Sequence, residues 1–396
     1  MFRRKLYFEL IRYVNNKEAL IINGMRQVGK TTLLSQIYST IESPYKLLLD
    51  LENVLNQQYF EDDNYDRINL TIRNLVKADA DEHIYLFLDE IQNIKKLPSI
   101  IKYLGDHFSY KFFLTGSVSF YLKNLFSESL AGRKYLFELN PLSFSEFLEF
   151  KSVKYKLPDE NEKANNTLYQ TFFPLYEEFA LYGGFPAVVL AKNREVKEKK
   201  LSEIFSSYYE KDIVNFSDYR KSKIIRDLML LLLARTGSKV KLTKLSSELG
   251  ITRITLAEYL SFLEATYFIK QIRPFSRNID TEIRQTPKIY VCDSGLANIL
   301  GRASFGHVFE TAIFHALYLK KPDSYFGSFL HYYQKKSGIE IDFLMDKKTA
   351  FEVKEKATFY DQKKLTRIAK DLKIEKNFLI SYHFSKLENV VYGWQV

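Results

Sequence analysis

The sequence predicts an α/β protein of several domains, and three observations carry that prediction. Short apolar runs alternate with helical stretches over the first 140 residues, as in a parallel sheet whose strands are buried on both faces. A glycine-rich segment joins the first run to the next helix. The length of 396 residues is enough for two or three domains.

Composition limits the function classes before any motif is considered. Hydrophobic residues make up 46% of the chain, enough to fill real cores, and Cys292 is the single cysteine, so no internal disulfide can form. We therefore expect a cytoplasmic protein. The basic start lacks the apolar core of a signal peptide, and no apolar run is long enough to span a bilayer, so no membrane partner is expected. A net charge of +10 favours nucleic acid as a partner, although many lysine-rich proteins are basic without one.

The first 140 residues are expected to form one domain of alternating strands and helices. Helical stretches such as 64–77 and 96–108 separate the apolar runs. This alternation indicates βαβ units and a parallel sheet. The expected strands are Ala19–Asn23, Lys46–Leu51, Ile84–Asp89, Lys111–Thr115 and Tyr135–Leu139.

Residues 24–31 match the phosphate-loop pattern G-x-x-x-x-G-K-[ST]. They follow an expected strand and lead into the helix Thr31–Tyr38, which is the context that the pattern requires. The alternative, an ordinary glycine turn, would not need a strand before it and a helix after it. Loop N–H groups and the helix N-terminus surround phosphate oxygens. Lys30 is expected to reach the β- and γ-phosphates of ATP, and the Thr31 hydroxyl to ligate Mg²⁺. The expected nucleotide-binding residues are Gly24, Gln27, Val28, Gly29, Lys30, Thr31 and Thr32.

Polar residues follow two further expected strands. The strand over 84–89 ends in Asp89 and Glu90. Beside a phosphate loop, Asp89 is expected to hold Mg²⁺ through water and Glu90 to polarise the attacking water. The next strand ends in Thr115-Gly116-Ser117. Ligands lie at the carboxyl ends of parallel strands, so Thr115 or Ser117 is a candidate to bind the γ-phosphate or the water.

Arg133 is the last candidate in this domain. An arginine finger acting on a neighbouring subunit and a γ-phosphate sensor are two roles that an arginine takes in phosphoryl transfer. An ordinary surface arginine is the third interpretation. A finger acting between subunits would require a homo-oligomer.

Several segments, in chain order, resemble the AAA-type ATPases of archaea and bacteria: GMRQVGKTTLL, FLDEIQNI, FFLTGS, LAGRK and PLSFSEF. More narrowly they resemble the branch in which a C-terminal domain of unknown function follows the ATPase domain, and YGGFPAVV and KIYVCDSGLA resemble later motifs of that branch. The resemblance covers nearly the whole chain. It implies the usual nucleotide-site roles for Lys30, Thr31, Asp89 and Glu90. The chain departs from many AAA-type enzymes in having Thr-Gly-Ser where they have a polar Asn.

The middle of the chain is expected to hold a helical subdomain over 141–235 and a winged helix-turn-helix over 236–278. Ser143 and Glu146 have the spacing of a capping box before the helix 144–151. Two helices, 242–249 and 251–265, flank Gly250 with helix-turn-helix spacing, and a wing is expected at 267–272. Such modules also bind proteins. If this one binds DNA, the expected contacts are Arg253, Thr255 and Lys244.

Residues 279–396 are expected to form an α/β domain, with helices over 307–318 and 361–372 and strands over 330–335, 340–345, 349–354 and 377–381. Asp342 followed by Glu352-x-Lys354 is typical of the restriction-endonuclease-like fold. Period-two alternation places Glu352 and Lys354 on one face of a strand. Glu310, Asp342 and Glu352 are the candidate Mg²⁺ ligands, and Lys354 would activate a water. Salt-bridged charges on a half-exposed strand are the alternative. Asp293 is interpreted as a turn residue.

Together these predictions favour a magnesium-dependent ATPase that binds or processes DNA and carries a nuclease-like domain. The alternative is a nucleotide-controlled switch that binds a protein partner, with an inactive nuclease-like domain. A third interpretation gives the C-terminal domain a role only in assembly.

Overall fold

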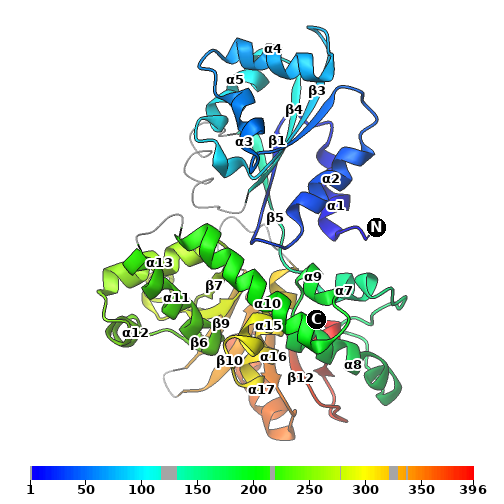
Figure 1. Ribbon diagram of the computed structural model, residues 1–396. Helices are drawn as coiled ribbons and strands as arrows, with labels where there is room; N and C mark the ends of the chain where they lie inside the picture. The colour runs from blue at the N-terminus through cyan, green and yellow to red at the C-terminus, as the bar shows by residue number, and fades with distance from the viewer. Residues whose placement is uncertain (1, 117–131, 215–218, 277, 321–328, 336–337) are drawn as a thin grey trace. The chain divides into compact units, whose positions relative to one another are not determined.

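The computed structural model describes residues 2–116, 132–214, 219–276, 278–320, 329–335 and 338–396 (Figure 1). The chain divides into two compact units, Met1–Asn140 with Ala265–Tyr267, and Pro141–Glu264 with Phe268–Val396. Over the described residues, no helix is both long and apolar enough to cross a membrane.

The first unit is built on a five-stranded parallel sheet, in the order β2-β3-β4-β1-β5. All five expected strands are confirmed, each within one residue at either end, because continuous apolar runs of this length leave little freedom in a sheet buried on both faces. The strands are β1 (Ala19–Asn23), β2 (Lys46–Asp50), β3 (Ile84–Asp89), β4 (Tyr110–Gly116) and β5 (Lys134–Glu138).

Helices cover both faces of this sheet (Figure 1). Helix α2 (Lys30–Thr40) packs on one face, where Tyr38 meets Phe87 edge to face. Helices α4 (Tyr65–Val76) and α5 (Leu97–His107) cover the other face in one apolar core with β1, β3 and β4. The remaining α-helices of this unit are α1 (Lys5–Leu10) and α3 (Val54–Gln57) among the described residues.

The second unit opens with helices. The predicted capping box is confirmed, because the Glu146 N–H donates to Ser143 Oγ at 3.3 Å and the Ser143 N–H donates to Glu146 Oε2 at 3.0 Å. It starts α7 (Phe144–Phe150). The other helices of this region are α8 (Asn166–Tyr182), α9 (Pro186–Val189), α10 (Arg194–Tyr208) and α11 (Tyr219–Ala234).

Two short helices and a small sheet follow. Helix α12 (Leu242–Glu248) and helix α13 (Arg253–Ala265) match the expected pair, and α13 starts two residues later than expected because Thr252 caps it: the Thr255 N–H donates to Thr252 Oγ1 at 3.1 Å. The antiparallel sheet has the order β6-β8-β7. Its strands are β6 (Ser238–Lys239), β7 (Ile269–Ile272) and β8 (Lys288–Val291), so its middle strand comes from beyond residue 278.

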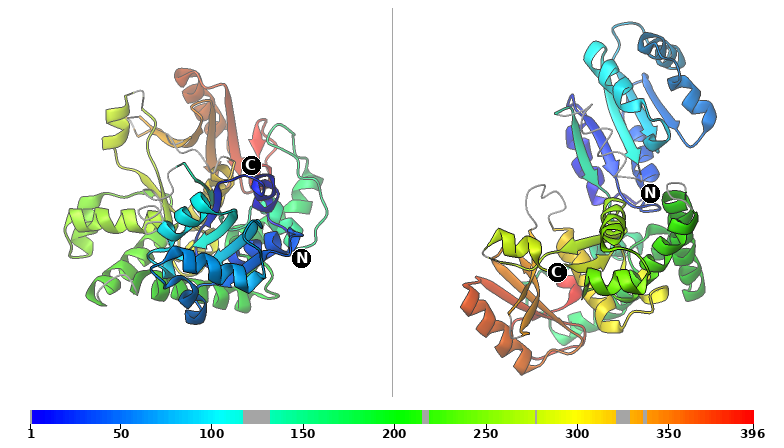
Figure 2. Two further views of the ribbon diagram at one scale, coloured as in Figure 1. Left: turned by 90° about the horizontal axis from the view of Figure 1, so that it is seen from above. Right: turned by 90° about the vertical axis from the view of Figure 1, so that its left-hand side faces the viewer.

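The C-terminal part has a five-stranded mixed sheet in the order β13-β12-β11-β10-β9. Strands β11 (Thr349–Lys354) and β12 (Lys376–Ser381) run parallel, and α17 (Phe359–Leu372) connects them (Figure 2). A parallel pair needs such a crossover. The remaining elements are β9 (Leu330–Gln334), β10 (Glu340–Met345), β13 (Val390–Val391), α14 (Ile279–Arg284), α15 (Ser294–Ile299) and α16 (Phe305–Tyr318).

Candidate functional site

The loop between β1 and α2 needs glycine at two positions. Gly24 has φ 153° and Gly29 has φ 99°, both in the region that side chains rarely adopt. A Cβ atom at Gly24 would lie 2.2 Å from the Leu139 carbonyl oxygen, so the close approach to the chain after β5 also requires glycine. The loop leads directly into the N-terminus of α2, and the N-terminus of a helix favours an anion.

Lys30 is the buried cation of this loop. Its Nζ donates to the carbonyl oxygens of Gly24 at 2.9 Å and Met25 at 3.0 Å. The ammonium is therefore already directed into the loop, where phosphate oxygens would compete with these carbonyls. Arg4 supports the loop from outside, donating to the carbonyls of Val28 at 2.9 Å and Asn140 at 2.7 Å. Arg4 could not be predicted as part of this site, because its partners lie far along the chain.

Thr115 links the two acids that follow β3. Strand β4 lies between β1 and β3. From its end, the buried Thr115 hydroxyl donates to Asp89 Oδ1 and accepts the Glu90 N–H at 3.2 Å. Thr115 therefore positions the acids. Burial raises the pKa of Asp89, and hydrogen bonds from Thr115 and Thr31 oppose that rise. Thr31 and Asp89, the two expected Mg²⁺ ligands, thus lie close enough for Thr31 to affect the Asp89 pKa.

Glu90 adopts a left-handed backbone, with φ 54°. Gln92 Nε2 donates to Glu90 Oε2 at 2.5 Å, which holds the carboxylate in place. A non-glycine residue in this conformation is strained, and such strain often occurs at functional sites. Ser117, the other expected catalytic residue, lies outside the described residues.

Arg133 is not placed at its own nucleotide loop. Ala19 and Arg133 lie side by side at the starts of β1 and β5, where the Ala19 N–H donates to the Arg133 carbonyl at 2.9 Å. The phosphate loop follows Asn23 at the other end of β1, about 15 Å away at roughly 3.3 Å per residue. The guanidinium is half exposed and pairs with Asp106 at 3.1 Å. A γ-phosphate sensor role within the same subunit is therefore wrong.

Family models match three stretches of the chain. Residues 16–148 match a model described as an AAA domain, and these residues hold the loop and the acids just described. This stretch is therefore similar to AAA domains. Beyond the AAA domain, residues 174–305 and 305–391 match two different domains of unknown function. The first of these models spans the helices α10 to α13 and the whole three-stranded sheet.

The relatives extend beyond the AAA domain. An uncharacterized protein of Haemophilus influenzae is 27% identical over 79% of this chain and 78% of its own length. An uncharacterized protein of Methanocaldococcus jannaschii is 28% identical over 96% of this chain and 85% of its own length. A solved structure of the Aeropyrum pernix Orc1 protein in complex with DNA aligns over 77% of this chain and 94% of that chain, with 13% identity and a TM-score of 0.36.

The helix-turn-helix pair exposes part of its expected DNA-binding set. Lys244 on α12 and Arg253 at the start of α13 are exposed. Thr255 is partly buried, and its hydroxyl lies 3.0 Å from that of Thr252 within the helix cap. Two apolar side chains of this pair are also exposed, Ile254 at 74% and Leu242 at 38%. Lys239, which flanks the pair in sequence, binds Glu340 at 2.6 Å.

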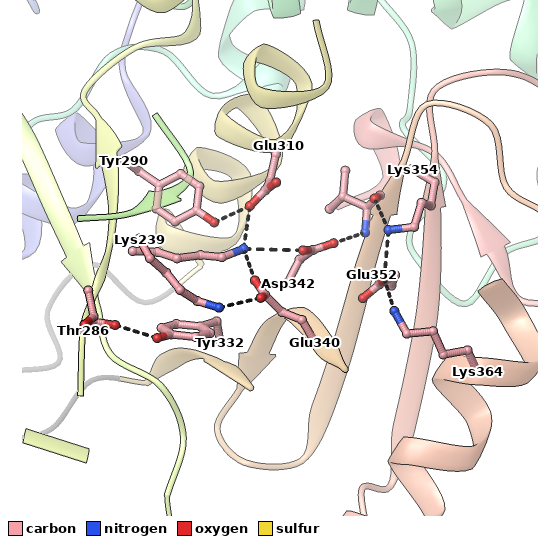
Figure 3. Close-up of polar contacts among 12 residues, drawn as sticks. Lys239, Thr286, Tyr290, Glu310, Tyr332, Glu340, Asp342, Glu352, Lys354 and Lys364 are labelled. Atoms are coloured by element: carbon pink, nitrogen blue, oxygen red, sulfur yellow. Dashed lines mark hydrogen bonds and ion pairs between the residues drawn. The ribbon is translucent and has the colours of Figure 1, made fainter. Parts of the chain in front are cut away.

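The C-terminal acids gather around a lysine. Glu310 comes from α16 and Asp342 from β10 (Figure 3). Between them lies the Lys288 ammonium from β8, 3.1 Å from Glu310, 3.5 Å from Asp342 and 2.7 Å from Glu340. Tyr290, on the same face of β8, donates to Glu310 at 2.6 Å. Burial and the charge of Asp342 raise the pKa of Glu310 to about 7.

Glu352 and Lys354 pair with each other, next to this group. Lys354 Nζ donates to Glu352 Oε1 at 2.8 Å, and Lys364 of α17 donates to the same oxygen at 3.3 Å. The second Asp342 oxygen accepts the Val353 N–H at 2.8 Å. Burial lowers the pKa of Lys354, but the charges of Glu352 and Asp342 outweigh it and raise the pKa overall. Lys354 is therefore an ion-pair partner and a poor base.

The expected metal site is not formed. Within the described part of the chain, no three acidic, histidine or cysteine side chains are arranged to hold a metal ion. The charge of Asp342 acts on both Glu310 and Glu352. However, lysine ammonium groups pair with the oxygens of these carboxylates. Lys288 could not be predicted as one of these lysines, because it lies on a different sheet. The prediction of Mg²⁺ ligands at Glu310, Asp342 and Glu352 is wrong for this structure.

Asp293 is confirmed as a turn residue. It is buried and caps α15, accepting N–H groups of Gly295 at 2.9 Å and Leu296 at 3.3 Å, and it also accepts the Gly184 N–H at 2.8 Å. Burial raises its pKa to about 7. This residue joins the YGGFP turn to the start of α15, which accounts for both motifs without a catalytic role.

Proposed function

We propose that this protein is a magnesium-dependent ATP hydrolase of the AAA type. The observation that carries the proposal is the hydrogen-bonded series Asp89–Thr115–Glu90 at the strand ends beside the phosphate loop. In this proposal, Lys30 and the loop N–H groups hold the β- and γ-phosphates. Thr31 and Asp89 hold Mg²⁺, and Glu90 orients the attacking water. Gln27, Val28 and Thr32 contribute loop and helix backbone.

Phosphate release from ATP tests the proposal. The full chain is expected to release phosphate in Mg²⁺ and to stop in excess EDTA, because the ion neutralises charge that develops between the β- and γ-phosphates. A rate that EDTA leaves unchanged would remove Thr31 and Asp89 from the mechanism.

We further propose that residues 236–291 form a winged helix that binds DNA through the start of α13. The exposed Arg253 and Lys244, with the net charge of +10, support this. The exposed Ile254 favours the competing candidate, a protein partner that would cover an apolar side chain. Salt dependence separates the two, since phosphate contacts release counterions and an apolar contact does not.

Arg253→Ala combined with Lys244→Ala is expected to weaken binding to duplex DNA about 10-fold or more and to reduce the salt slope, with roughly one unit lost per phosphate contact. Fluorescence anisotropy over a salt series measures both. Lys199→Ala, which removes an exposed lysine of α10 in the same unit, is the matched control. If wild type, the double variant and Lys199→Ala bind duplex DNA with equal affinity, α13 is excluded as the DNA contact and the protein-binding switch is favoured.

The trans role of Arg133 stays a prediction. As a finger completing a neighbouring subunit's site, Arg133→Ala would lose turnover about 10³-fold while keeping ATP affinity, and the wild-type rate per chain would rise with protein concentration. If Arg133 only pairs with Asp106, turnover stays within about 2-fold, as for an exposed ion pair. Two measurements decide between the finger and the ion-pair role. They are the hydrolysis rate at protein concentrations that span oligomer formation, and the affinity for a fluorescent ATP analogue.

For the C-terminal part, we propose a restriction-endonuclease-like arrangement that does not cleave DNA. The pairing of β10 with β11 and the parallel β12 after α17 support the arrangement. The lysines on the carboxylates argue against cleavage. The proposal fails if the wild type nicks any DNA in Mg²⁺ or Mn²⁺ and Asp342→Ala does not.

A further inference from the structure

The acidic cluster of the C-terminal part already contains its own cations. Glu310, Glu340, Asp342 and Glu352 are the four carboxylates joined in the network of Figure 3. They meet four ammonium groups, those of Lys239, Lys288, Lys354 and Lys364. With four lysines for four acidic side chains, this network already has a cation for each carboxylate and needs no further one. A divalent ion added to it would leave two positive charges in excess in a largely buried place, which is costly.

Lys288 holds the central position among these cations. It contacts three of the four carboxylates, and its side chain is only 6% exposed. Burial alone would lower its pKa, but the charges of Glu310, Asp342 and Glu340 outweigh burial and raise the pKa. The ammonium therefore stays protonated, and it lies where a metal ion shared by Glu310 and Asp342 would have to bind.

The lysines that bind Glu340 come from another sheet. Lys288 on β8 and Lys239 on β6 are register partners in the three-stranded sheet. Both reach Glu340 on β10, at 2.7 Å and 2.6 Å. Both ammonium groups also lie over the Tyr332 ring, 5.8 Å and 4.9 Å from its centre. Ion pairs of this cluster thus join the three-stranded sheet to the five-stranded sheet.

We propose that Lys288 is the permanent cation of this cluster and occupies the place that a divalent metal ion would take. Its ion pairs also join the three-stranded sheet to the five-stranded C-terminal sheet. The cluster then serves as a structural joint between the two sheets. A divalent ion enters only when the Lys288 ammonium is removed, because the freed Glu310, Glu340 and Asp342 oxygens are the hard ligands that such an ion prefers. This role is independent of ATP hydrolysis.

Binding of Mn²⁺ to the nucleotide-free full chain, followed by electron paramagnetic resonance, tests the proposal. Wild type and Asp342→Asn should bind the same number of ions. Lys288→Met should bind one additional Mn²⁺ at this cluster, at least 10-fold more tightly than wild type does. The double variant Lys288→Met with Asp342→Asn should lose this additional ion. Lys288→Arg keeps the charge and should gain none. The nucleotide site is identical in all these proteins, so its contribution cancels.

The proposal is overturned if Asp342→Asn removes one Mn²⁺ from the otherwise wild-type chain, since the carboxylates would then hold a metal despite Lys288. This comparison does not require Lys288→Met to fold. Thermal unfolding gives a second readout: Mn²⁺ should raise the midpoint of Lys288→Met and leave that of wild type unchanged. A folded Lys288→Met that neither binds Mn²⁺ nor responds to it would also overturn the proposal.

Discussion

Lys30→Ala is expected to lower ATP hydrolysis by at least about 10²- to 10³-fold, the usual effect of losing one group that stabilises transition-state charge. The wild-type ammonium is buried and already points into the loop, where it donates to Gly24 and Met25. Alanine removes the one buried cation expected on the β- and γ-phosphates, so ATP affinity should fall as well. Phosphate release and a fluorescent ATP analogue measure the two effects.

The matched control is Lys17→Ala, which removes an exposed lysine of the same unit near the start of β1, away from the loop. Its rate should equal that of wild type. Unfolding midpoints should show that both variants fold. Hydrolysis by Lys30→Ala at the wild-type rate would mean that the phosphate loop is not the catalytic site.

Glu90→Gln is expected to lower turnover by about 10²- to 10⁴-fold, the range for a lost general base, with ATP affinity retained within about 2-fold. The amide keeps the shape of the side chain and its neighbours Gln92 and Thr115, but it cannot accept a proton from water. Stopped-flow binding and single-turnover hydrolysis separate affinity from chemistry.

Glu61→Gln, at an exposed position of the same unit, is the control for a changed charge. If Glu90→Gln instead loses affinity and keeps its turnover at saturating ATP, the carboxylate serves in binding. The general-base role would then have to move to another residue.

Much of the AAA domain could be predicted because its signals are local. The buried strands of a parallel sheet read as continuous apolar runs, so β1 to β5 were placed to within a residue. The phosphate loop requires glycine at two fixed backbone positions, Gly24 and Gly29, and this requirement is visible in the sequence. The Ser143 capping box likewise depends on residues three positions apart.

Contacts between distant segments could not be predicted. Period-two alternation placed Glu352 and Lys354 on one face of a strand, but nothing local indicated that Lys288 would reach between Glu310 and Asp342 from another sheet. Arg133 was linked to the nucleotide site by its sequence neighbourhood, whereas strand pairing places it at the opposite end of β5. In both cases the decisive information is which strands pair and in what register, and one sequence does not contain it.

The most direct test of the central claim is phosphate release by the full chain at low salt, in Mg²⁺ and in excess EDTA, with and without duplex, single-stranded and branched DNA. The rate of Lys30→Ala is the baseline against which the wild-type rate is compared. We predict hydrolysis that requires Mg²⁺ and Lys30, and a several-fold rise in rate with DNA. A rate that no DNA changes would contradict the DNA-coupled account and favour a protein-binding switch. A wild-type rate equal to that of Lys30→Ala would contradict the ATPase itself.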